Sequence, residues 1–483
     1  MKRAVVNARW WLDSSPTNLL IENDRVVYRG ADDVSAEETL NADGRFLLPA
    51  FVEPHCHILP AGMDLLRLDL SRFSSREEVL RAVSEAARSV AESDWLQVTH
   101  YDANRFADGK NIEIAELDLA TGGVPTILRH SSGHSCLVNS RVVLIGGIAD
   151  ASDPSGGTVE RDDNGSPTGI LNETAMGLAY RHVPKPTKFQ MRDAIKMAAD
   201  HMRSFEITLA ADMQTGNISI EDELWAYRAV QDDGCTVKMR LYLDWKAVFV
   251  KNVELADIKQ DERLRVCGVK LFADGAIGPG TAAIYGAFDT GKDGQMIYSP
   301  EELKRRILMA DAAGFAVAVH SIGDRSTDHV LNCFEACAAP SRHRIEHAML
   351  LSDEQIARIS RLGHTVTAQP SFLRHFQQGY FRRLGERASS LKRLRSILDA
   401  KIPLALSSDA PIVPFDPWTG LAVSTNRPGA YSQSENISAK EALFLYTQGA
   451  ANALGDGDVC GSLAPGQVAD YQLLEESPLE RLK

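Results

Sequence analysis

The sequence predicts an α/β fold, a TIM-like (β/α)8 barrel joined to a small β-sandwich domain that both chain ends build. From Ser299 onward, helices with their own start and stop signals alternate with short apolar strands. Looser strand candidates upstream bring the predicted parallel strands to eight, and short β-rich runs lie at both ends of the chain. Such alternation is typical of parallel strands with helices outside, and eight strands indicate a closed barrel.

The strands follow in order along the chain. Three short runs near the start and a turn followed by a strand at 461–474 indicate a β domain from residues 1–48 and 458–483. The barrel is expected over residues 49–457. Its eight strands are predicted at residues 46–57, 207–213, 238–245, 266–272, 315–320, 343–347, 364–369 and 402–409.

Helix signals separate the later strands. Ser299 and Pro300 start a helix that ends at Gly314, and Ser352 with Gln355 forms a capping box before a helix that ends at Gly363. A single helix is predicted from the Ser438 capping box to about residue 454, with others over 324–338 and around 389–400. Residues 95–185 fit neither pattern, and we expect them to form an insertion over the barrel mouth.

Composition limits the function classes. The 483 residues carry 65 acidic and 52 basic side chains, and the net charge of −13 is spread along the chain. This argues against nucleic acid or an anionic membrane as a partner and favours a small-molecule substrate. No run of eighteen apolar residues occurs, and Arg9 and Asp13 interrupt the opening residues, so a cytoplasmic protein is expected. The seven scattered cysteines indicate reduced thiols rather than a disulfide framework.

Two histidines end the first barrel strand. His55 and His57 are two residues apart, so both imidazoles should share one face of the strand while Cys56 points away. Imidazole pairs suit zinc and similar ions. Taken alone, the triplet is better explained by two histidines that are satisfied by hydrogen bonds at a strand end.

Further ligand-type residues lie at the ends of other strands, where barrels keep their active sites. His320, His347 and Asp409 each end a predicted strand, and Lys270 lies in an apolar one. Singly, His320 could be a hydrogen-bonded core residue, Asp409 a helix cap, and His347 a partner of Glu346 or Arg344. Their joint occurrence predicts a metal centre.

Lys270 is unusual, because an ammonium group on a buried strand is costly unless it is paired or deprotonated. Burial depresses its pKa, and a neutral amine near metal ions can add carbon dioxide to form a carbamate that bridges two cations. A salt bridge from Lys270 to Asp274 is the alternative.

The order HxH, Lys, His, His, Asp on successive strands resembles the amidohydrolase superfamily. Segments around these residues are similar to its YtcJ-like branch (amidohydrolase 3 type), which includes N-substituted formamide deformylases. The similar segments include residues 131–140, 165–173, 268–275, 320–324, 344–347 and 408–411. Glu53 before Pro54 departs from the branch, where Asp is commoner.

The resemblance implies metal-dependent hydrolysis of a non-peptide carbon–nitrogen bond in a small molecule. One or two divalent cations, zinc foremost, would be held by His55, His57, Lys270, His320, His347 and Asp409. The metal would activate a water as hydroxide, with Asp409 as the proton shuttle. His134 could stabilise the oxyanion, and His134, Glu173 and Asp274 are the candidates for substrate contact.

Alternatives remain open at this point. Within the superfamily, the chain could be a mononuclear deaminase or an N-acyl amino-acid deacylase in which Lys270 stays an amine. From another class, it could be a non-catalytic scaffold of this fold. A homodimer is possible, and the insertion residues Trp95, Tyr101 and Arg129 could line a substrate pocket with His134.

Overall fold

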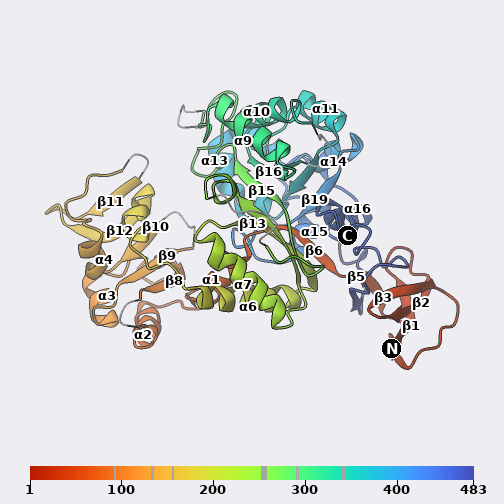
Figure 1. Cartoon of the computed structure of the whole chain (residues 1–483). Helices are drawn as coiled ribbons and strands as arrows, with labels where there is room; N and C mark the ends of the chain where they lie inside the picture. Colours follow the sequence, from red (N-terminus) through yellow and green to blue (C-terminus); the bar gives the residue numbers. More distant parts are fainter. Residues whose placement is uncertain are drawn as a thin grey trace. The chain divides into compact units, whose positions relative to one another are not determined.

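The computed structural model describes residues 1–91, 94–131, 135–154, 157–251, 258–289, 291, 293–338 and 343–483. The chain divides into two compact units. The first combines residues 1–61 with 198–483, and the second comprises residues 62–197. Figure 1 colours both by sequence, so the second unit is orange to yellow.

Eight parallel strands form the barrel of the first unit. They pair in the order β19-β18-β17-β16-β15-β14-β13-β6, so each strand neighbours the next one along the chain. Every barrel strand predicted from the sequence is present, which confirms the fold class. The strands are β6 (Phe51–Cys56), β13 (Ile207–Thr215), β14 (Lys238–Asp244), β15 (Leu264–Phe272), β16 (Ala316–Ser321), β17 (Arg344–His347), β18 (Thr365–Ala368) and β19 (Leu404–Leu406).

The first and last strands meet at their carboxyl ends. The amide of Asp409 donates to the carbonyl of His55 at 2.9 Å, and the amide of His57 donates to the carbonyl of Ala410 at 2.7 Å. The buried carboxylate of Glu53 accepts from the amides of His55 at 3.1 Å and Ser408 at 3.0 Å. Burial raises the pKa of Glu53 to about 8 despite these bonds. Residues that the sequence proposes as ligands therefore lie on the seam that closes the barrel.

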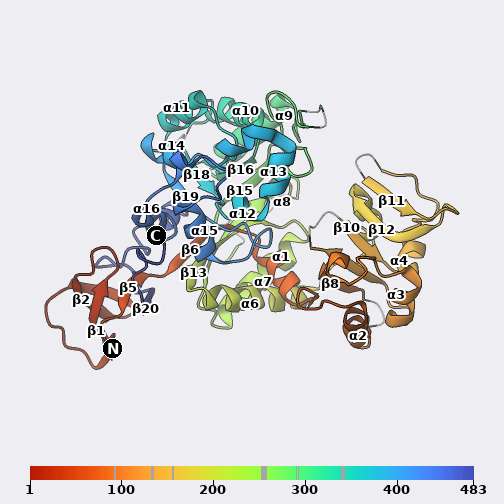
Figure 2. The ribbon, with the colours of Figure 1, turned by 180° about the vertical axis from the view of Figure 1, so that it is seen from behind.

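Helices cover the outside of these strands, as Figures 1 and 2 show for α9, α10, α11 and α14. Ser299 caps α9 with Pro300 in its first turn, and Ser352 and Gln355 form the predicted capping box of α11. The helices after β13 are α7 (Ile220–Asp232), α8 (Trp245–Phe249), α9 (Pro300–Ala312), α10 (Asp324–Phe334), α11 (Asp353–Leu362), α12 (Phe372–His375), α13 (Gln377–Leu384), α14 (Leu394–Asp399), α15 (Pro417–Thr425), α16 (Ala439–Leu445) and α17 (Gln448–Ala453).

Two element predictions were wrong in detail. The single helix expected from Ser438 to about residue 454 is split into α16 and α17 at Tyr446 and Thr447. The carbonyl of Tyr446 accepts instead from the amide of Val52 in β6, at 3.0 Å, so the break ties these helices to the barrel. The strand expected at 46–57 is also two strands, β5 (Phe46–Pro49) and β6, which belong to different sheets.

The chain ends share one six-stranded sheet. Its main path runs β20-β5-β1-β2-β3, and β4 pairs with β1. The C-terminal strand lies antiparallel to β5, beside which Figure 2 also places it. The strands are β1 (Lys2–Trp10), β2 (Pro16–Glu22), β3 (Arg25–Gly30), β4 (Glu38–Asn41), β5 and β20 (Tyr471–Leu474). The domain limits at 48 and 458 stay predictions.

The second unit has its own sheet, in the order β11-β12-β10-β9-β8-β7, and its own apolar clusters. The insertion predicted at 95–185 falls within this unit, and its place over the barrel mouth stays a prediction. The strands are β7 (Leu68–Asp69), β8 (Leu96–Tyr101), β9 (Thr126–His130), β10 (Ser135–Val138), β11 (Gly157–Arg161) and β12 (Pro167–Glu173). The helices are α2 (Arg76–Ala87), α3 (Ile114–Thr121), α4 (Ser140–Ile145) and α5 (Gly177–Tyr180), while α1 (Ile58–Leu65) and α6 (Lys188–Ser204) cross the unit limits.

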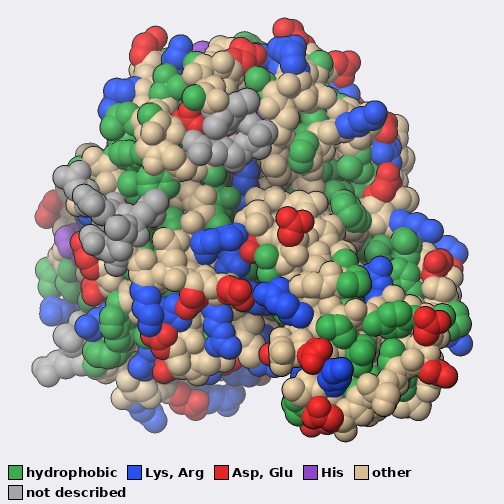
Figure 3. Space-filling model, turned by 45° about the vertical axis from the view of Figure 1, so that its right-hand side comes forward, with side chains coloured by type: hydrophobic (Ala, Val, Ile, Leu, Met, Phe, Trp, Pro, Cys, Tyr) green, Lys and Arg blue, Asp and Glu red, His purple; other side chains and the backbone are tan. Residues whose placement is uncertain are grey.

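Charged side chains of both signs are interspersed on the face drawn in Figure 3. Within the described residues, no helix combines the length and the apolar character that crossing a lipid bilayer requires.

Candidate metal centre

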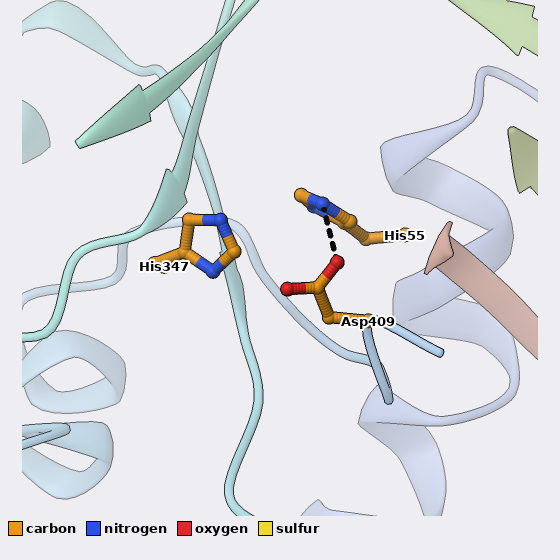
Figure 4. Close-up of side chains that lie close together, drawn as sticks. All are labelled: His55, His347 and Asp409. Carbon is orange, nitrogen blue, oxygen red and sulfur yellow. Dashed lines mark ion pairs between the residues drawn. The ribbon is translucent and has the colours of Figure 1, made fainter. Parts of the chain in front are cut away.

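Asp409 lies between the two histidines of the first strand. Its Oδ1 atom is 3.3 Å from Nε2 of His55 and 3.3 Å from Nε2 of His57. His347 joins them, because ligand atoms of His55, His347 and Asp409 all lie within 4.8 Å of one another (Figure 4). The residues come from β6, β17 and the segment after β19, so three strand ends converge on one point.

Asp409 Oδ1 is buried and has no hydrogen-bond partner among the described residues. Two ligands held about 2.0–2.1 Å from a tetrahedral zinc lie roughly 3.3–3.4 Å apart, which matches the spacing around this oxygen. Burial would raise the pKa of Asp409, but His55 and His57 outweigh it and hold the pKa well below its usual value. The donor set therefore fits a divalent cation.

Each imidazole is fixed through one ring nitrogen. His55 Nδ1 lies 2.5 Å from Glu346 Oε2, His347 Nδ1 lies 2.8 Å from Gln369 Oε1, and His320 Nε2 lies 2.9 Å from the carbonyl of Gly275. Because these partners accept hydrogen bonds, each bonded ring nitrogen is the donor, and the hydrogen bond fixes the orientation of its ring.

His320 and His347 are also held in the neutral form. Their ring centroids are 4.5 Å apart. Burial and the nearby Lys270 lower the pKa of His320 to about 3, while burial and the nearby His320 lower the pKa of His347 well below its usual value. Neutral imidazoles are the form that binds metal.

Glu346 has a different partner from the one that the sequence suggests. It was considered as a partner of His347, whereas the structure pairs it with His55. Arg344 donates to both oxygens of Glu346, at 2.8 and 3.1 Å, and both residues are buried. Burial would raise the pKa of Glu346, but Arg344 and His55 lower it to about 2. The sequence did contain a signal for this pair, because Arg344 and Glu346 are oppositely charged and lie two positions apart on a buried strand.

Lys270 is 1% exposed, and its Nζ lies 3.5 Å from His55 Nε2. Burial lowers the pKa of Lys270, which favours the neutral amine over the ammonium form. The alternative salt bridge to Asp274 does not occur in the described structure. Asp274 instead accepts from the amides of Ile322, Gly323 and Ala283 and from the Ser326 hydroxyl.

The carboxylate of Asp274 therefore holds the segments that follow β15 and β16, and it does not face an open pocket. It is 1% exposed, and its Oδ1 lies 3.7 Å from His320 Nε2. Desolvation raises its pKa to about 6 although four groups donate to it. Its contacts tie the ends of β15 and β16 together behind His320, which suits support of a ligand residue better than substrate contact.

The remaining predicted site residues are in the second unit. His134 lies outside the described residues, and Glu173 ends β12, where it pairs with Gly157. Trp95 and Tyr101 are 8% and 2% exposed and pack in the unit's hydrophobic clusters, so they offer little surface to a substrate. Arg129 donates to Asp64 at 2.5 Å.

Left-handed backbone occurs at two of the ligand-type residues. The φ angle is +74° at His347 and +64° at Asp409, and Ala348 follows at +43°. Side chains other than glycine seldom adopt this region, which costs about 1–3 kcal/mol and concentrates at functional sites. The sequence has no signal for it.

A parallel barrel with imidazoles, a buried lysine and a carboxylate at its carboxyl end defines a metal-dependent hydrolase. The model described as amidohydrolase family matches residues 38–482. The chain therefore belongs to the amidohydrolase family, as the sequence resemblance implied.

Individual relatives agree with this assignment. The YtcJ protein of Bacillus subtilis (strain 168), which is named as an amidohydrolase, is 29% identical over 91% of this chain and 86% of its own length. An N-substituted formamide deformylase of Arthrobacter pascens is 28% identical over 94% of this chain and 87% of its own. The crystal structure of an uncharacterized metal-dependent hydrolase from Pyrococcus furiosus is 27% identical, with a TM-score of 0.83 over 99% of this chain and 100% of that one.

Proposed function

We propose that the protein is cytoplasmic and hydrolyses a non-peptide carbon–nitrogen bond of the amide type in a small molecule. The observation that carries this proposal is the buried oxygen of Asp409, which has no described hydrogen-bond partner and lies 3.3 Å from two imidazole nitrogens. The deformylase relative acts on N-substituted formamides by its name, and it supports the choice of bond.

The residues that would hold divalent cations are His55, His57, His320, His347 and Asp409, with Lys270 added if it is carbamylated. Zinc is proposed first, because imidazole and carboxylate ligands suit it. A cation bound there would lower the pKa of a water molecule toward neutrality and polarise the substrate carbonyl.

Asp409 is the proposed proton shuttle. Its carboxylate stays ionised because its pKa is well below the usual value, so it can accept a proton from the attacking water. The water oxygen bonds to the carbonyl carbon, the carbon–nitrogen bond breaks, and Asp409 returns the proton to the leaving nitrogen. The products are a carboxylic acid and an amine. His134 is proposed as a donor to the oxyanion and Glu173 as a substrate contact, on the sequence resemblance alone.

A mononuclear variant of this function is the second candidate. It is favoured by the convergence of ligand atoms from His55, His347 and Asp409 on a single point. In that case Lys270 stays an amine and binds no metal, although its Nζ lies 3.5 Å from His55 Nε2. Deaminases and N-acyl amino-acid deacylases are the reaction classes to compare.

The test combines turnover with metal analysis. Protein that has been stripped with a chelator and then reloaded with zinc, manganese or iron is assayed on formamides, N-acyl amino acids and aminated heterocycles. We expect hydrolysis of an amide only in the reloaded samples, with one or two equivalents of metal per chain. Intact mass spectrometry under mild conditions detects a carbamate on Lys270. A metal-loaded protein that turns over no amide would refute the proposal and favour a non-catalytic scaffold.

A further inference from the structure

A cavity of about 290 Å³ lies at the carboxyl ends of three neighbouring barrel strands, β13, β14 and β15. Lys270 lines it and also approaches His55, so the cavity borders the candidate metal centre. Trp245 and Phe272 give it aromatic walls. Its volume is at the lower limit of small-molecule sites, which are roughly 300–1,000 Å³, so it suits part of a small molecule.

Among the described lining residues, Asp244 is the one carboxylate, and both of its oxygens accept hydrogen bonds. Oδ1 of Asp244 accepts from the amides of Lys246 and Ala247, at 2.9 and 3.2 Å. Its Oδ2 accepts from Nε2 of Gln214 at 3.1 Å. Asp244 thus caps α8 and holds Gln214, and its single negative charge is outnumbered by the two exposed lysines that line the same cavity.

Two exposed lysines line the same cavity. Lys246 and Lys251 are exposed and form no ion pair within the part of the chain that the structure describes. Asn217 and Tyr298 add an amide and a hydroxyl whose side chains form no hydrogen bond with described residues. Two ammonium groups beside neutral donors favour an anion over a neutral ligand, because each ammonium attracts it at close range.

We propose that this cavity binds a carboxylate group of the substrate, so that the amides hydrolysed carry a carboxylate close to the scissile bond. The inference rests on the proposed function for the bond that is broken. Lys246 and Lys251 would be specificity residues that contact the carboxylate, while the centre beside Lys270 holds the amide. A substrate of this class spans from the metal centre to the two lysines.

The test compares matched ligands that differ only in charge. N-Formyl and N-acetyl amino acids are paired with their carboxamides, which have nearly the same shape but no carboxylate. We expect kcat/KM to be at least about tenfold higher for the acids. In the variant carrying Lys246→Met and Lys251→Met, the preference should fall to near one through a rise in KM for the acid.

A binding measurement keeps the two proposals apart. Calorimetric titration with N-acetylglycine at low salt should show saturable binding that the double variant weakens about tenfold or more, while N-acetylglycinamide binds weakly to both. Lys304→Met, at an exposed lysine of α9 that does not line the cavity, controls for the loss of a positive charge. Binding without turnover of any pair would refute the hydrolytic function and keep the anion site. Equal binding of acid and carboxamide, or an undiminished acid affinity in the double variant, would overturn the anion site itself.

Discussion

Gln369 holds His347 by the ring nitrogen that faces away from the centre. Its Oε1 lies 2.8 Å from His347 Nδ1 and accepts a second hydrogen bond, at 2.8 Å, from Nζ of Lys392. Lys392 also donates to the carbonyl of His347 at 2.9 Å, and both Gln369 and Lys392 are fully buried. The amide of Gln369 is oriented in turn by its Nε2, which donates to the Ser407 hydroxyl at 3.0 Å.

Replacing Gln369 by Leu should weaken metal binding. Without the acceptor, the proton of His347 can move to the nitrogen that the metal needs, and loss of such support typically costs about 10–100-fold in affinity. Gln369→Glu keeps an acceptor and should lose much less. Competition with a chromophoric chelator measures the affinity. Gln472→Leu, at a buried glutamine in β20, is the control for cavity effects, and an equal loss in both Leu variants would contradict the role of Gln369.

Replacing Asp409 by Asn should separate binding from catalysis. The amide keeps the size of the side chain and one oxygen for the metal, but it cannot take a proton from water. Once a hydrolysed amide is identified, we expect kcat to fall about 10²–10⁴-fold while much of the metal is retained. Asp399→Asn, at an exposed carboxylate in α14, should leave kcat unchanged. Unchanged turnover in Asp409→Asn would remove Asp409 from the mechanism.

The barrel strands and the ligand-type residues were predictable because each strand has its own apolar run and its own polar end. His55 and Asp409 could be placed at strand ends without knowledge of the rest of the chain. Their proximity follows from closure of the barrel, which a sequence pattern of eight strands implies.

The contacts that support the ligand residues were not predictable, because they join residues that are far apart in the sequence. Glu346 approaches His55 across 291 positions, and Glu53 approaches Ser408 across 355, so neither pair leaves a local pattern. The positive φ of His347 likewise depends on the surrounding structure rather than on the residue type. The split at Tyr446 arises from a bond to Val52, a partner in another element.

Removing both histidines of the first strand should reduce the metal content. His55→Ala with His57→Ala deletes two ligand nitrogens that lie 3.3 Å from Asp409 Oδ1. Elemental analysis after dialysis should show at least one equivalent less than in the parent protein. His182→Ala, at an exposed histidine, is the control. Unaltered stoichiometry in the double variant would mean that the first strand holds no metal.

His364 should make the barrel sensitive to acid. It lies just before β18, fully buried, and neither ring nitrogen has a hydrogen-bond partner in the described structure. Its ring packs 4.5 Å from that of Phe334. Burial and the nearby His343 lower its pKa to about 4, against about 6.5 in an unfolded chain. Protonation therefore favours unfolding, so stability is fully present above about pH 6.5 and is lost progressively down to about pH 4.

Between pH 7 and pH 5, the shift implies a loss of about 2 kcal/mol in the free energy of unfolding from this one group. His364→Leu has a similar volume and cannot titrate, so the variant should lose less stability over that range than the parent. The measurement is the urea midpoint at both pH values for both proteins, with the exposed His182→Leu as the control. Because the metal centre is unchanged in His364→Leu, its own pH dependence cancels in the comparison. Parallel losses in parent and variant would show that His364 is hydrated or hydrogen-bonded in the folded protein.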